Sequence, residues 1–562
     1  MKDHILKAAV LFTLTTAMIL ALGAQAAPAD KERYIVSFQD VSKGKSALKR
    51  AGGDVLLDLP RQGAVAARIP ARALKGLQRN PNIEYIEVDA LRFPMSETTP
   101  WGIPTVQADL LNDAGTGNTL VCIIDSGYSN GHEDLPVLNS NNATWDPGTG
   151  DPLATSSICH HGTHVAGTIA ATANSVGVVG VNPKGNVALH IIKIFEDDAN
   201  SPSGCGWGYS SNLVAALDAC IAAAGPGQKT IVNMSLGGPT KNRTEQRAFS
   251  NANNAGVLSI AAAGNDGNTR HSYPASYDSV VSVAAVDSAL VVADFSQQTN
   301  QVELAAPGVA VRSTVSMGKG TEESLAVGGV GYEATGMEGS SQTPATGSLF
   351  RCSTVDGFGS PGDCTGASGK VCLISRGNIS FAEKAAECES QGGVGVVIFN
   401  NSAALFSGTF GETIVSIPGV GVSGADGAVL ESKTGQSATV TTTIGNYSYY
   451  DGTSMATPHV AGVAALVWSQ DTSCSNDQVR TALNSTAADL GAVGRDTAYG
   501  YGLVQASDAV DFLGQDCGGG GGDGGGGGGG QCDLLPQGAS CSSDNECCSS
   551  ACKGKPGGKT CK

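Results

Sequence analysis

The residues best suited to chemistry lie at 452–462, where small residues lead into Ser454 and an Ala/Val-rich segment with helical potential follows. A serine at a helix start has a fixed position, and nearby backbone N–H groups point outward with the positive end of the helix dipole. That arrangement suits a nucleophile whose attack creates an oxyanion. A lone Gly-Thr-Ser would instead indicate the N-cap of a core helix, so the rest of the chain must supply the other catalytic groups.

Two upstream stretches carry candidate acid–base groups. An apolar run at 118–124 ends in Asp125 and a glycine turn. This is typical of a strand buried on both faces, and α/β sheets carry their sites at the carboxyl ends of such strands. His161 and His164 stand three residues apart, a spacing that could also hold a metal, but no H-E-x-x-H pattern or third ligand of obvious spacing supports zinc. Taken alone, Asp125 could simply cap a turn.

Taken together, these motifs resemble those of the subtilisin-like proteases, and the order Asp125, His161, Ser454 is the order found in that family. The resemblance implies an acyl-enzyme on Ser454, with His161 as the proton acceptor and Asp125 holding the imidazole. It leaves His164 a structural role.

The same resemblance implies the remaining parts of a peptide-cleaving site. Residues 231–238 look like the family's substrate strand, in which backbone groups of Ser235, Leu236 and Gly237 pair with an extended peptide. Residues 257–265 resemble the strand that ends in the oxyanion asparagine, here Asn265, with Ala263 and Gly264 as further substrate contacts. Asn-Asp-Gly alone would indicate only a turn.

A structural calcium ion is also implied by the resemblance, and no organic cofactor is expected. Asp134 follows Asp125 by nine residues, and residues 172–178 resemble the family's calcium loop. The implied shell is all oxygen: the side chains of Asp134, Asn174 and Glu97 and the carbonyls of Thr172, Val176 and Val178. The alternative is an ordinary surface aspartate beside a turn.

Length, charge and cysteines indicate an exported protein of several domains. The chain has 562 residues and 16 cysteines, and a short apolar run after two lysines ends in Ala-Gln-Ala, as a secretory signal does. Residues 28–95 carry a net charge of +4, whereas the chain from Ser96 onward carries −22. An acidic body without Lys/Arg clusters argues against nucleic-acid binding, and we expect no membrane association and a secreted, extracellular monomer.

The expected organisation has six parts. A signal peptide (1–26) precedes an α+β unit (27–95) that resembles the family's inhibitory prodomain and would act as an intramolecular inhibitor. The catalytic domain (96–325 and 446–517) is interrupted by an insert (326–445) with a strand, helix, strand pattern that resembles a protease-associated domain. A glycine linker (518–530) leads to a cysteine-rich module (531–562).

The roles of the insert and of the cysteine-rich module each have more than one interpretation. The insert either shapes substrate access or is passive, because no catalytic constellation occurs in it. The spacing of the six terminal cysteines resembles a cystine-knot miniprotein, although six cysteines allow fifteen connectivities and a metal cluster is the alternative. The module is an adhesion element, a removable appendage or an inhibitor-like element. Cys474 and Cys517 are expected to pair.

We therefore expect an α/β fold, a parallel sheet with helices on both faces, and a secreted serine endopeptidase made as a self-processing precursor. A non-catalytic scaffold would have lost one of the four catalytic residues, and none is lost. An esterase with the same triad is a second rival, but the prodomain-like leader and the substrate strand favour peptides. The absence of an acidic cluster for dibasic substrates favours a broad, largely apolar preference at the cleaved bond.

Overall fold

The computed structural model describes residues 31–88, 97–145, 149–201, 204–206, 208–411 and 415–516, and the backbone of Cys552–Lys553 and Thr560–Cys561. The chain divides into two compact units, residues 1–95 and 96–562. The expected signal peptide, glycine linker and most of the cysteine-rich module lie outside the described residues. No helix in the described ranges is long and apolar enough to cross a membrane.

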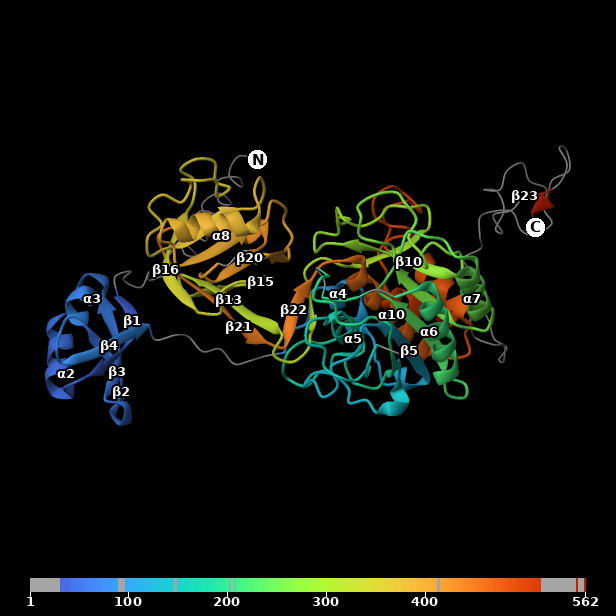
Figure 1. Ribbon diagram of the computed structural model, residues 1–562, viewed down its shortest axis with the longest axis horizontal. Helices are drawn as coiled ribbons and strands as arrows, with labels where there is room; N and C mark the ends of the chain where they lie inside the picture. The colour runs from blue at the N-terminus through green and yellow to red at the C-terminus, as the bar shows by residue number, and fades with distance from the viewer. Residues whose placement is uncertain are drawn as a thin grey trace, which may run out of the picture. The chain divides into compact units, whose positions relative to one another are not determined.

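The first unit is a four-stranded antiparallel sheet with two helices (Figure 1). The strand order is β2-β3-β1-β4, and Leu48 and Leu77 of the helices pack with Val36 and Val65 of the sheet. Strand β2 was not predicted, because its residues are mostly exposed and show no apolar alternation. The elements are β1 (Lys31–Phe38), α2 (Val41–Arg50), β2 (Asp54–Leu59), η1 (Pro60–Gln62), β3 (Ala64–Pro70), α3 (Ala71–Gln78) and β4 (Ile83–Val88).

The second unit contains a seven-stranded parallel sheet in the order β11-β10-β9-β8-β5-β7-β6. Its central strand β5 is buried along its whole length, as a strand covered on both faces must be. The strands are β5 (Thr119–Asp125), β6 (Ala143–Trp145), β7 (Ala188–Lys193), β8 (Lys229–Met234), β9 (Leu258–Ala262), β10 (Val280–Val286) and β11 (Val302–Pro307).

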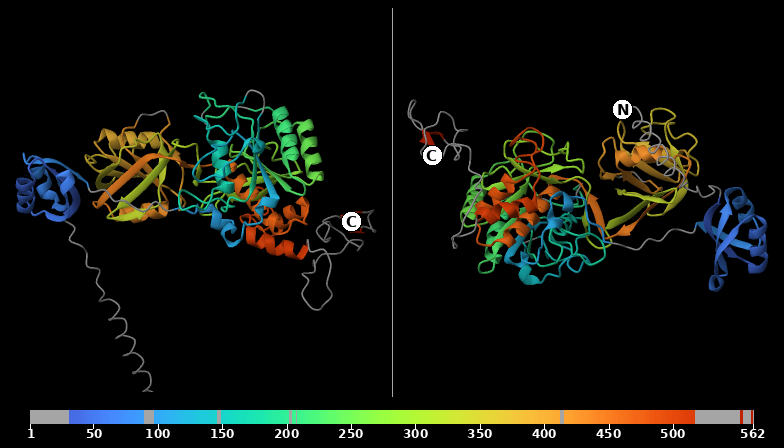
Figure 2. Two further views of the ribbon diagram at one scale, coloured as in Figure 1. Left: turned by 90° about the horizontal axis from the view of Figure 1, so that it is seen from below. Right: turned by 180° about the vertical axis from the view of Figure 1, so that it is seen from behind.

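Alternate residues of β5 enter two different cores, so both faces of the sheet are covered. Val121 and Ile123 pack with α5, α10, α11 and α12, whereas Cys122 and Ile124 pack with α6 and α7. In Figure 2 the green helices α6 and α7 lie apart from the orange-red helices α11 and α12. The helices are α4 (Gly102–Thr105), η2 (Ala108–Leu110), η3 (Thr116–Asn118), η4 (Ser140–Asn142), α5 (His161–Ala170), α6 (Ser210–Ala223), α7 (Arg243–Asn254), α10 (Thr453–Gln470), α11 (Asn476–Ser485) and α12 (Ala506–Asp516). The predicted α/β class is confirmed.

The insert forms a second, nine-stranded sheet in the order β14-β13-β21-β16-β17-β18-β20-β15-β19, in which β16, β17, β18 and β20 are parallel neighbours. The sheet begins at Gly320 rather than at the expected residue 326, because β13 pairs with β21 over its full length. Its elements are β13 (Gly320–Val327), β14 (Val330–Tyr332), β15 (Thr335–Glu338), β16 (Ala345–Arg351), β17 (Val371–Ser375), α8 (Phe381–Ser390), β18 (Gly395–Phe399), β19 (Gly408–Thr409), β20 (Gly419–Val422), α9 (Gly424–Glu431) and β21 (Ser437–Gly445).

A short antiparallel pair flanks the insert: β12 (Val311–Thr314) precedes it, and β22 (Tyr447–Tyr450) follows it and leads into α10. The described residues of the cysteine-rich module form β23 (Cys552–Lys553) and β24 (Thr560–Cys561), which pair antiparallel.

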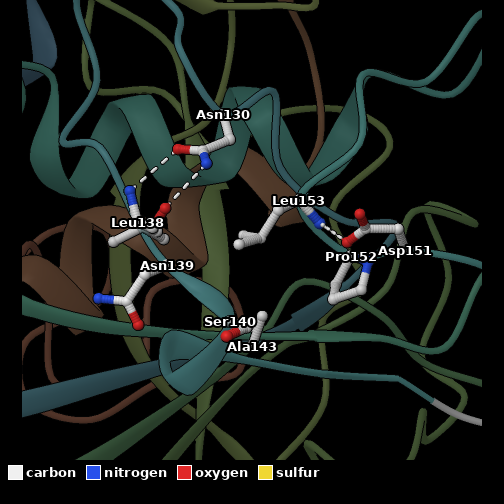
Figure 3. A pocket seen from close by; sticks show the side chains of 8 residues that line it. All are labelled: Asn130, Leu138, Asn139, Ser140, Ala143, Asp151, Pro152 and Leu153. Carbon is white, nitrogen blue, oxygen red and sulfur yellow. Dashed lines mark hydrogen bonds between the residues drawn. The ribbon is translucent and has the colours of Figure 1, made fainter.

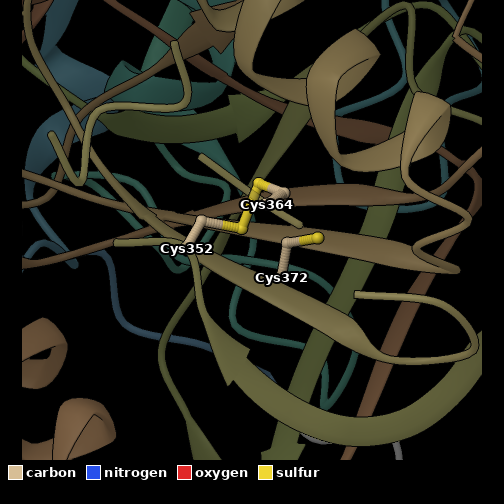
Figure 4. Close-up of side chains that lie close together, drawn as sticks. All are labelled: Cys352, Cys364 and Cys372. Carbon is tan, nitrogen blue, oxygen red and sulfur yellow. A yellow bond between two sulfur atoms is a disulfide. The ribbon is translucent and has the colours of Figure 1, made fainter. Parts of the chain in front are cut away.

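Four disulfides join described cysteines: Cys122–Cys220, Cys159–Cys205, Cys352–Cys364 and Cys372–Cys388. Cys474 is also disulfide-bonded, but its expected partner Cys517 lies outside the described residues. The sulfur atoms of Cys352, Cys364 and Cys372 lie within 4.8 Å of one another in the core of the insert (Figure 4). All three are oxidised, so they offer no thiolate to a metal.

Candidate functional site

Asp125 is the last residue of β5, and its side chain is fully buried. The start of α5 lies close against this strand end, since a Cβ atom at Gly162 would lie 2.3 Å from the carbonyl oxygen of Gly127. Only glycine permits that approach. The Gly162 N–H donates to Ser126 Oγ (2.9 Å) and fixes the contact. The packing of α5 on β5 therefore brings His161 to Asp125.

His161 is the first residue of α5, and its Nδ1 lies 2.8 and 3.0 Å from the two carboxylate oxygens of Asp125. Burial lowers the pKa of His161, but the charge of Asp125 and its hydrogen bond outweigh burial and raise that pKa above its ordinary value. Because Nδ1 carries the proton shared with Asp125, Nε2 is left to accept one. The side chain is 23% exposed, so Nε2 can be reached from solvent.

Ser454 is the second residue of α10. Gly452 directly precedes the helix, and its φ of 154° directs the chain into it. Its Oγ donates to the carbonyl of Ser235 (3.1 Å), and Ser235 Oγ donates to the carbonyl of Ser454 (2.7 Å). Among the described residues Ser454 Oγ makes no hydrogen bond to His161. Catalytic hydrogen bonds often form only when substrate binds, so the missing bond is compatible with a Ser454–His161 pair.

Asn265 lies three residues beyond the end of β9 and is exposed. Its Oδ1 accepts both the backbone N–H (2.9 Å) and the hydroxyl (2.8 Å) of Thr453. Since both partners are donors, Nδ2 must point away from Thr453. The Gly264 N–H donates to the same hydroxyl (3.2 Å). Sequence reasoning did not single out Thr453, although it stands inside the 452–462 motif next to Ser454.

The predicted substrate segment begins where β8 ends. Ser235, Leu236 and Gly237 were expected within a strand, but β8 stops at Met234 and these residues follow it. Ladder pairing resumes only at Gly238, which exchanges both backbone hydrogen bonds with Tyr273 (2.9 and 2.8 Å). Gly237 is exposed and thus open to pairing.

Ala263 and Gly264 follow β9, the strand next to β8, so the two predicted substrate segments leave adjacent strands at the same edge of the sheet.

A depression of about 330 Å³ lies between the loops around Asn130 and Asp151 (Figure 3). The Asn130 side chain bonds both the N–H (2.9 Å) and the carbonyl (2.8 Å) of Leu138, and Asp151 accepts the N–H of Leu153 (2.9 Å). These polar groups hold their own loops together. The Tyr128 N–H donates to the carbonyl of Pro152 (2.8 Å), which ties the second loop to the segment after Asp125.

His164 is a buried structural residue, as its motif predicted. Its Nε2 lies 3.0 Å from the carbonyl oxygen of Val311 and 3.1 Å from that of Ser448, and its ring stacks on Tyr450 at 4.4 Å. Burial lowers the pKa of His164 to about 3, so the ring is neutral and donates to these carbonyls. It connects α5 to both strands that flank the insert.

The predicted calcium residues come together around Asp134. Its carboxylate is buried and accepts the amide of Asn174 (3.1 Å) and the Val178 N–H (2.8 Å), while its backbone carbonyl accepts the Thr172 N–H (2.9 Å). Glu97 accepts the N–H groups of Asn174 (2.5 Å) and Ser175 (3.0 Å). The Val176 N–H donates to Asn174 Oδ1 (3.0 Å).

The chemistry of this cluster fits a hard cation. Burial raises the pKa of Asp134 to about 7, and the charges of Glu97 and Glu133 add to the rise against the lowering effect of the Val178 N–H and Tyr447. No Lys or Arg within the described ranges forms an ion pair with these three carboxylates. Of the three, Asp134 is buried, and carboxylate oxygens without an ion pair are the ligands that calcium prefers. Asn174 directs its nitrogen at Asp134, and half a turn of its amide would present the oxygen.

Two neighbours of this cluster were missed. Tyr447 places its hydroxyl 3.3 Å from Glu133 Oε1, and Asn446 donates to the same oxygen (2.8 Å). Both follow the insert, more than 300 residues after Glu133 in the chain, and no local pattern connects segments so distant.

A parallel α/β sheet that carries an aspartate–histidine pair and a helix-start serine at its carboxyl edge defines the class of α/β serine hydrolases. The model of the subtilase family matches residues 116–342 and 314–502, so the chain belongs to the subtilase family. It is a subtilisin-like serine peptidase, as predicted, and acts on protein substrates.

Individual relatives agree with this assignment. Subtilisin E of Bacillus subtilis (strain 168) is 33% identical over 340 residues, which cover 57% of this chain and 84% of that protein. The thermostable alkaline protease of Halalkalibacterium halodurans is 32% identical over 314 residues, 54% of this chain and 80% of its own. The crystal structure of the psychrophilic subtilisin-like protease Apa1 from the Antarctic Pseudoalteromonas sp. AS-11 has a TM-score of 0.66 and 44% identity, and the match covers 75% of this chain and 99% of that one.

Proposed function

We propose that this chain is a secreted endopeptidase that cleaves peptide bonds through an acyl-enzyme on Ser454, with Asp125 and His161 completing the triad and Asn265 the oxyanion hole. The observation that carries the proposal is the contact of His161 Nδ1 with both oxygens of the buried Asp125 carboxylate, at 2.8 and 3.0 Å. A buried anion on one ring nitrogen makes the other nitrogen a stronger base.

The reaction follows from these positions. Ser454 Oγ turns from the Ser235 carbonyl, gives its proton to His161 Nε2 and attacks the substrate carbonyl carbon. The oxyanion accepts hydrogen bonds from Asn265 Nδ2 and the Ser454 N–H. His161 then returns the proton to the leaving amine as the C–N bond breaks. A water molecule, deprotonated by His161, hydrolyses the acyl-enzyme and releases the acid product with Ser454 restored.

We place the substrate backbone along Ser235, Leu236 and Gly237 on one side and Ala263 and Gly264 on the other. An extended peptide between them gains main-chain hydrogen bonds as an added strand does. The exposed Gly237 leaves room for this pairing. The preference at the cleaved bond is broad and largely apolar in this proposal, and exclusive cleavage after Lys-Arg would refute it.

The unit at 31–88 is proposed as the inhibitory prodomain of a precursor exported through the signal at 1–26, with maturation between Arg92 and Thr99. Its net charge of +4, counted over 28–95, opposes that of the chain from Ser96 onward, −22, which favours association. The insert is proposed as a protease-associated domain, and residues 531–562 as a cystine-knot module.

Calcium is proposed at Asp134, held with Asn174, Glu97 and the carbonyls of Thr172, Val176 and Val178. When bound, the ion would neutralise the buried carboxylate of Asp134 and the carboxylate of Glu97, and it would stabilise the loop at 172–178. It has no part in the bond-breaking steps.

The test expresses the precursor and its Ser454→Ala variant side by side and follows mass and casein hydrolysis. The proposal predicts that the wild type sheds its N-terminal segment near Ser96 and gains activity, whereas the variant does neither. Wild-type activity in the variant would mean that another residue is the nucleophile. If the wild type is also silent after the segment is removed by an added protease, the chain is a scaffold and not a peptidase.

A further inference from the structure

A second depression lies wholly within the insert, at the carboxyl ends of its parallel strands β17 and β18. Open parallel sheets bind ligands in the crevice outside these strand ends. The depression has a volume of about 590 Å³ and is lined by residues 376–381 together with Glu383, Asn401 and Thr409. None of these residues belongs to the catalytic site described above.

Arg376, the residue after β17, is the one cationic group that lines this depression. Its backbone N–H donates to the carbonyl of Phe399 (2.8 Å), and its Nη1 donates to Asn400 Oδ1 (3.0 Å). The centre of the guanidinium lies 4.9 Å from the ring of Phe406 and 5.7 Å from that of Phe381. Two aromatic rings and an amide thus hold the side chain in place.

Arg376 has no anionic partner at ion-pair distance among the described residues. In this it differs from Arg351 of the same sheet, whose Nε bonds Glu431 (2.7 Å) and whose Nη1 bonds three carbonyl oxygens. A guanidinium has five N–H donors, and the described hydrogen bonds of Arg376 use one of them. The remaining donors are available to a ligand.

The rim of the depression is polar. Asn378, Ser380, Asn401 and Thr409 are exposed, and their side chains can donate or accept hydrogen bonds. The one acidic lining residue, Glu383, is already engaged, because its Oε2 accepts the N–H (2.8 Å) and the hydroxyl (2.7 Å) of Ser380. The site therefore offers one cation without an ion pair, four neutral polar side chains, and one carboxylate that is held by Ser380.

The insert contacts the segment that leads into α10, and Arg376 acts on this segment electrostatically. Burial raises the pKa of Asp451, and the positive charge of Arg376 opposes that rise, so the guanidinium lies within electrostatic range of Asp451. Asp451 directly precedes Gly452 at the start of α10. Strand β15 of the insert likewise contacts β22, which ends one residue before Asp451.

We propose that this depression is an exosite that binds a carboxylate of the polypeptide substrate through Arg376. The inference rests on the proposed peptidase function and names a substrate feature, an acidic group remote from the cleaved bond. A guanidinium pairs with a carboxylate through two parallel hydrogen bonds, and Phe381 and Phe406 keep it oriented for them. The carboxylate belongs to an acidic side chain or to a chain terminus.

The experiment measures binding by fluorescence anisotropy to the full processed chain, after a serine-directed sulfonyl fluoride has blocked hydrolysis. Three labelled peptides of one Gly/Ser-rich sequence are compared: one with three Glu and an amidated end, one with three Gln and an amidated end, and the Gln peptide with a free carboxyl end. The amidated Glu peptide or the free-end Gln peptide should bind about tenfold more tightly than the amidated Gln peptide, as one charge-assisted pair implies. Which of the two gains identifies the source of the carboxylate.

Arg376→Gln should abolish this preference, and Lys433→Gln should retain it. Lys433 is a matched control because its ammonium also lies over an aromatic ring of the insert, 5.4 Å from the centre of Tyr332. Should Arg376→Gln fail to fold, Asn401→Asp adds a negative charge at an exposed rim position and should weaken the preference. Equal binding of the three peptides overturns the proposal, as does a preference that survives both Arg376→Gln and Asn401→Asp. A chain that fails to cleave casein but shows the preference would refute the proposed peptidase function alone.

Discussion

Replacing Thr453 by valine tests the proposed oxyanion hole through a residue that is fully buried. The Thr453 hydroxyl donates to Asn265 Oδ1 (2.8 Å) and accepts the Gly264 N–H (3.2 Å). Valine has nearly the same shape and removes both hydrogen bonds. Asn265 keeps one partner, the Thr453 backbone N–H at 2.9 Å, so its amide is less firmly oriented but still present.

The expected loss lies between two limits. One net hydrogen bond contributes about 1 kcal/mol, or roughly five- to tenfold in rate. Complete loss of an oxyanion donor costs about 10²–10³ in kcat. We expect kcat on a peptide anilide to fall about tenfold with KM nearly unchanged, because the oxyanion exists only in the transition state.

Three comparisons make this prediction refutable. Thr453→Ser keeps the hydroxyl and should restore kcat, whereas Thr457→Val removes a similar buried hydroxyl, bonded to the Thr453 carbonyl (2.7 Å), and should leave kcat unchanged. Because Thr453 acts through Asn265, adding Thr453→Val to Asn265→Ala should slow the enzyme no further. Multiplicative losses in the double variant would contradict the reasoning.

Three further changes follow from the same structure. Asp125→Asn should lower kcat about 10⁴-fold. Activity rises with pH as His161 loses its proton, and Asp125 raises the pKa of His161, so the acid limb of the kcat/KM profile should also move to lower pH in this variant. An acid limb at the wild-type pH would count against the Asp125–His161 pair. Chelation should lower the melting temperature of the wild type in calorimetry; if calcium was present at 100 times its Kd, its removal lowers the free energy of unfolding by about 2.7 kcal/mol. The Asp134→Asn variant should have a lower melting temperature than the wild type, and chelator should not lower it further. Replacing Cys122 and Cys220 by alanine opens a loop with a sequence separation of 98 and should cost up to about 4.7 kcal/mol in urea unfolding; an unchanged midpoint would mean that the disulfide is not formed.

Local sequence patterns predicted those parts of the fold that depend on local interactions. Helix α8 (Phe381–Ser390) is the helix of the strand, helix, strand pattern predicted for the insert, and Ser380 and Glu383 form a reciprocal capping box at its start. The continuous apolar run before Asp125 became the buried strand β5. Strand β2 was not predicted, because its residues are mostly exposed and do not alternate between apolar and polar side chains.

Contacts between distant segments could not be read from the sequence. The pairing of Cys122 with Cys220 requires knowing that α6 packs on β5, and the role of Thr453 requires the approach of Asn265 from another strand. The strand was predicted to extend too far, through the substrate segment, because the apolar pattern continues to Leu236 whereas the hydrogen-bonded ladder of β8 stops at Met234. Periodicity shows which residues face a core but not where a ladder ends.

The pairing of β12 with β22 explains how a large insert can directly precede the proposed nucleophile without displacing it. These strands join in register from Val311↔Tyr450 to Thr314↔Tyr447, so the chain leaves and re-enters the catalytic part side by side. The cost of closing a loop grows only slowly with its length, and an insert mounted on a closed pair adds little strain to its base. His164 Nε2 donates to carbonyls of Val311 and Ser448, one on each strand. The helix that begins with His161 therefore also holds the strand pair that leads to Ser454, which couples the proposed base to the proposed nucleophile across the insertion.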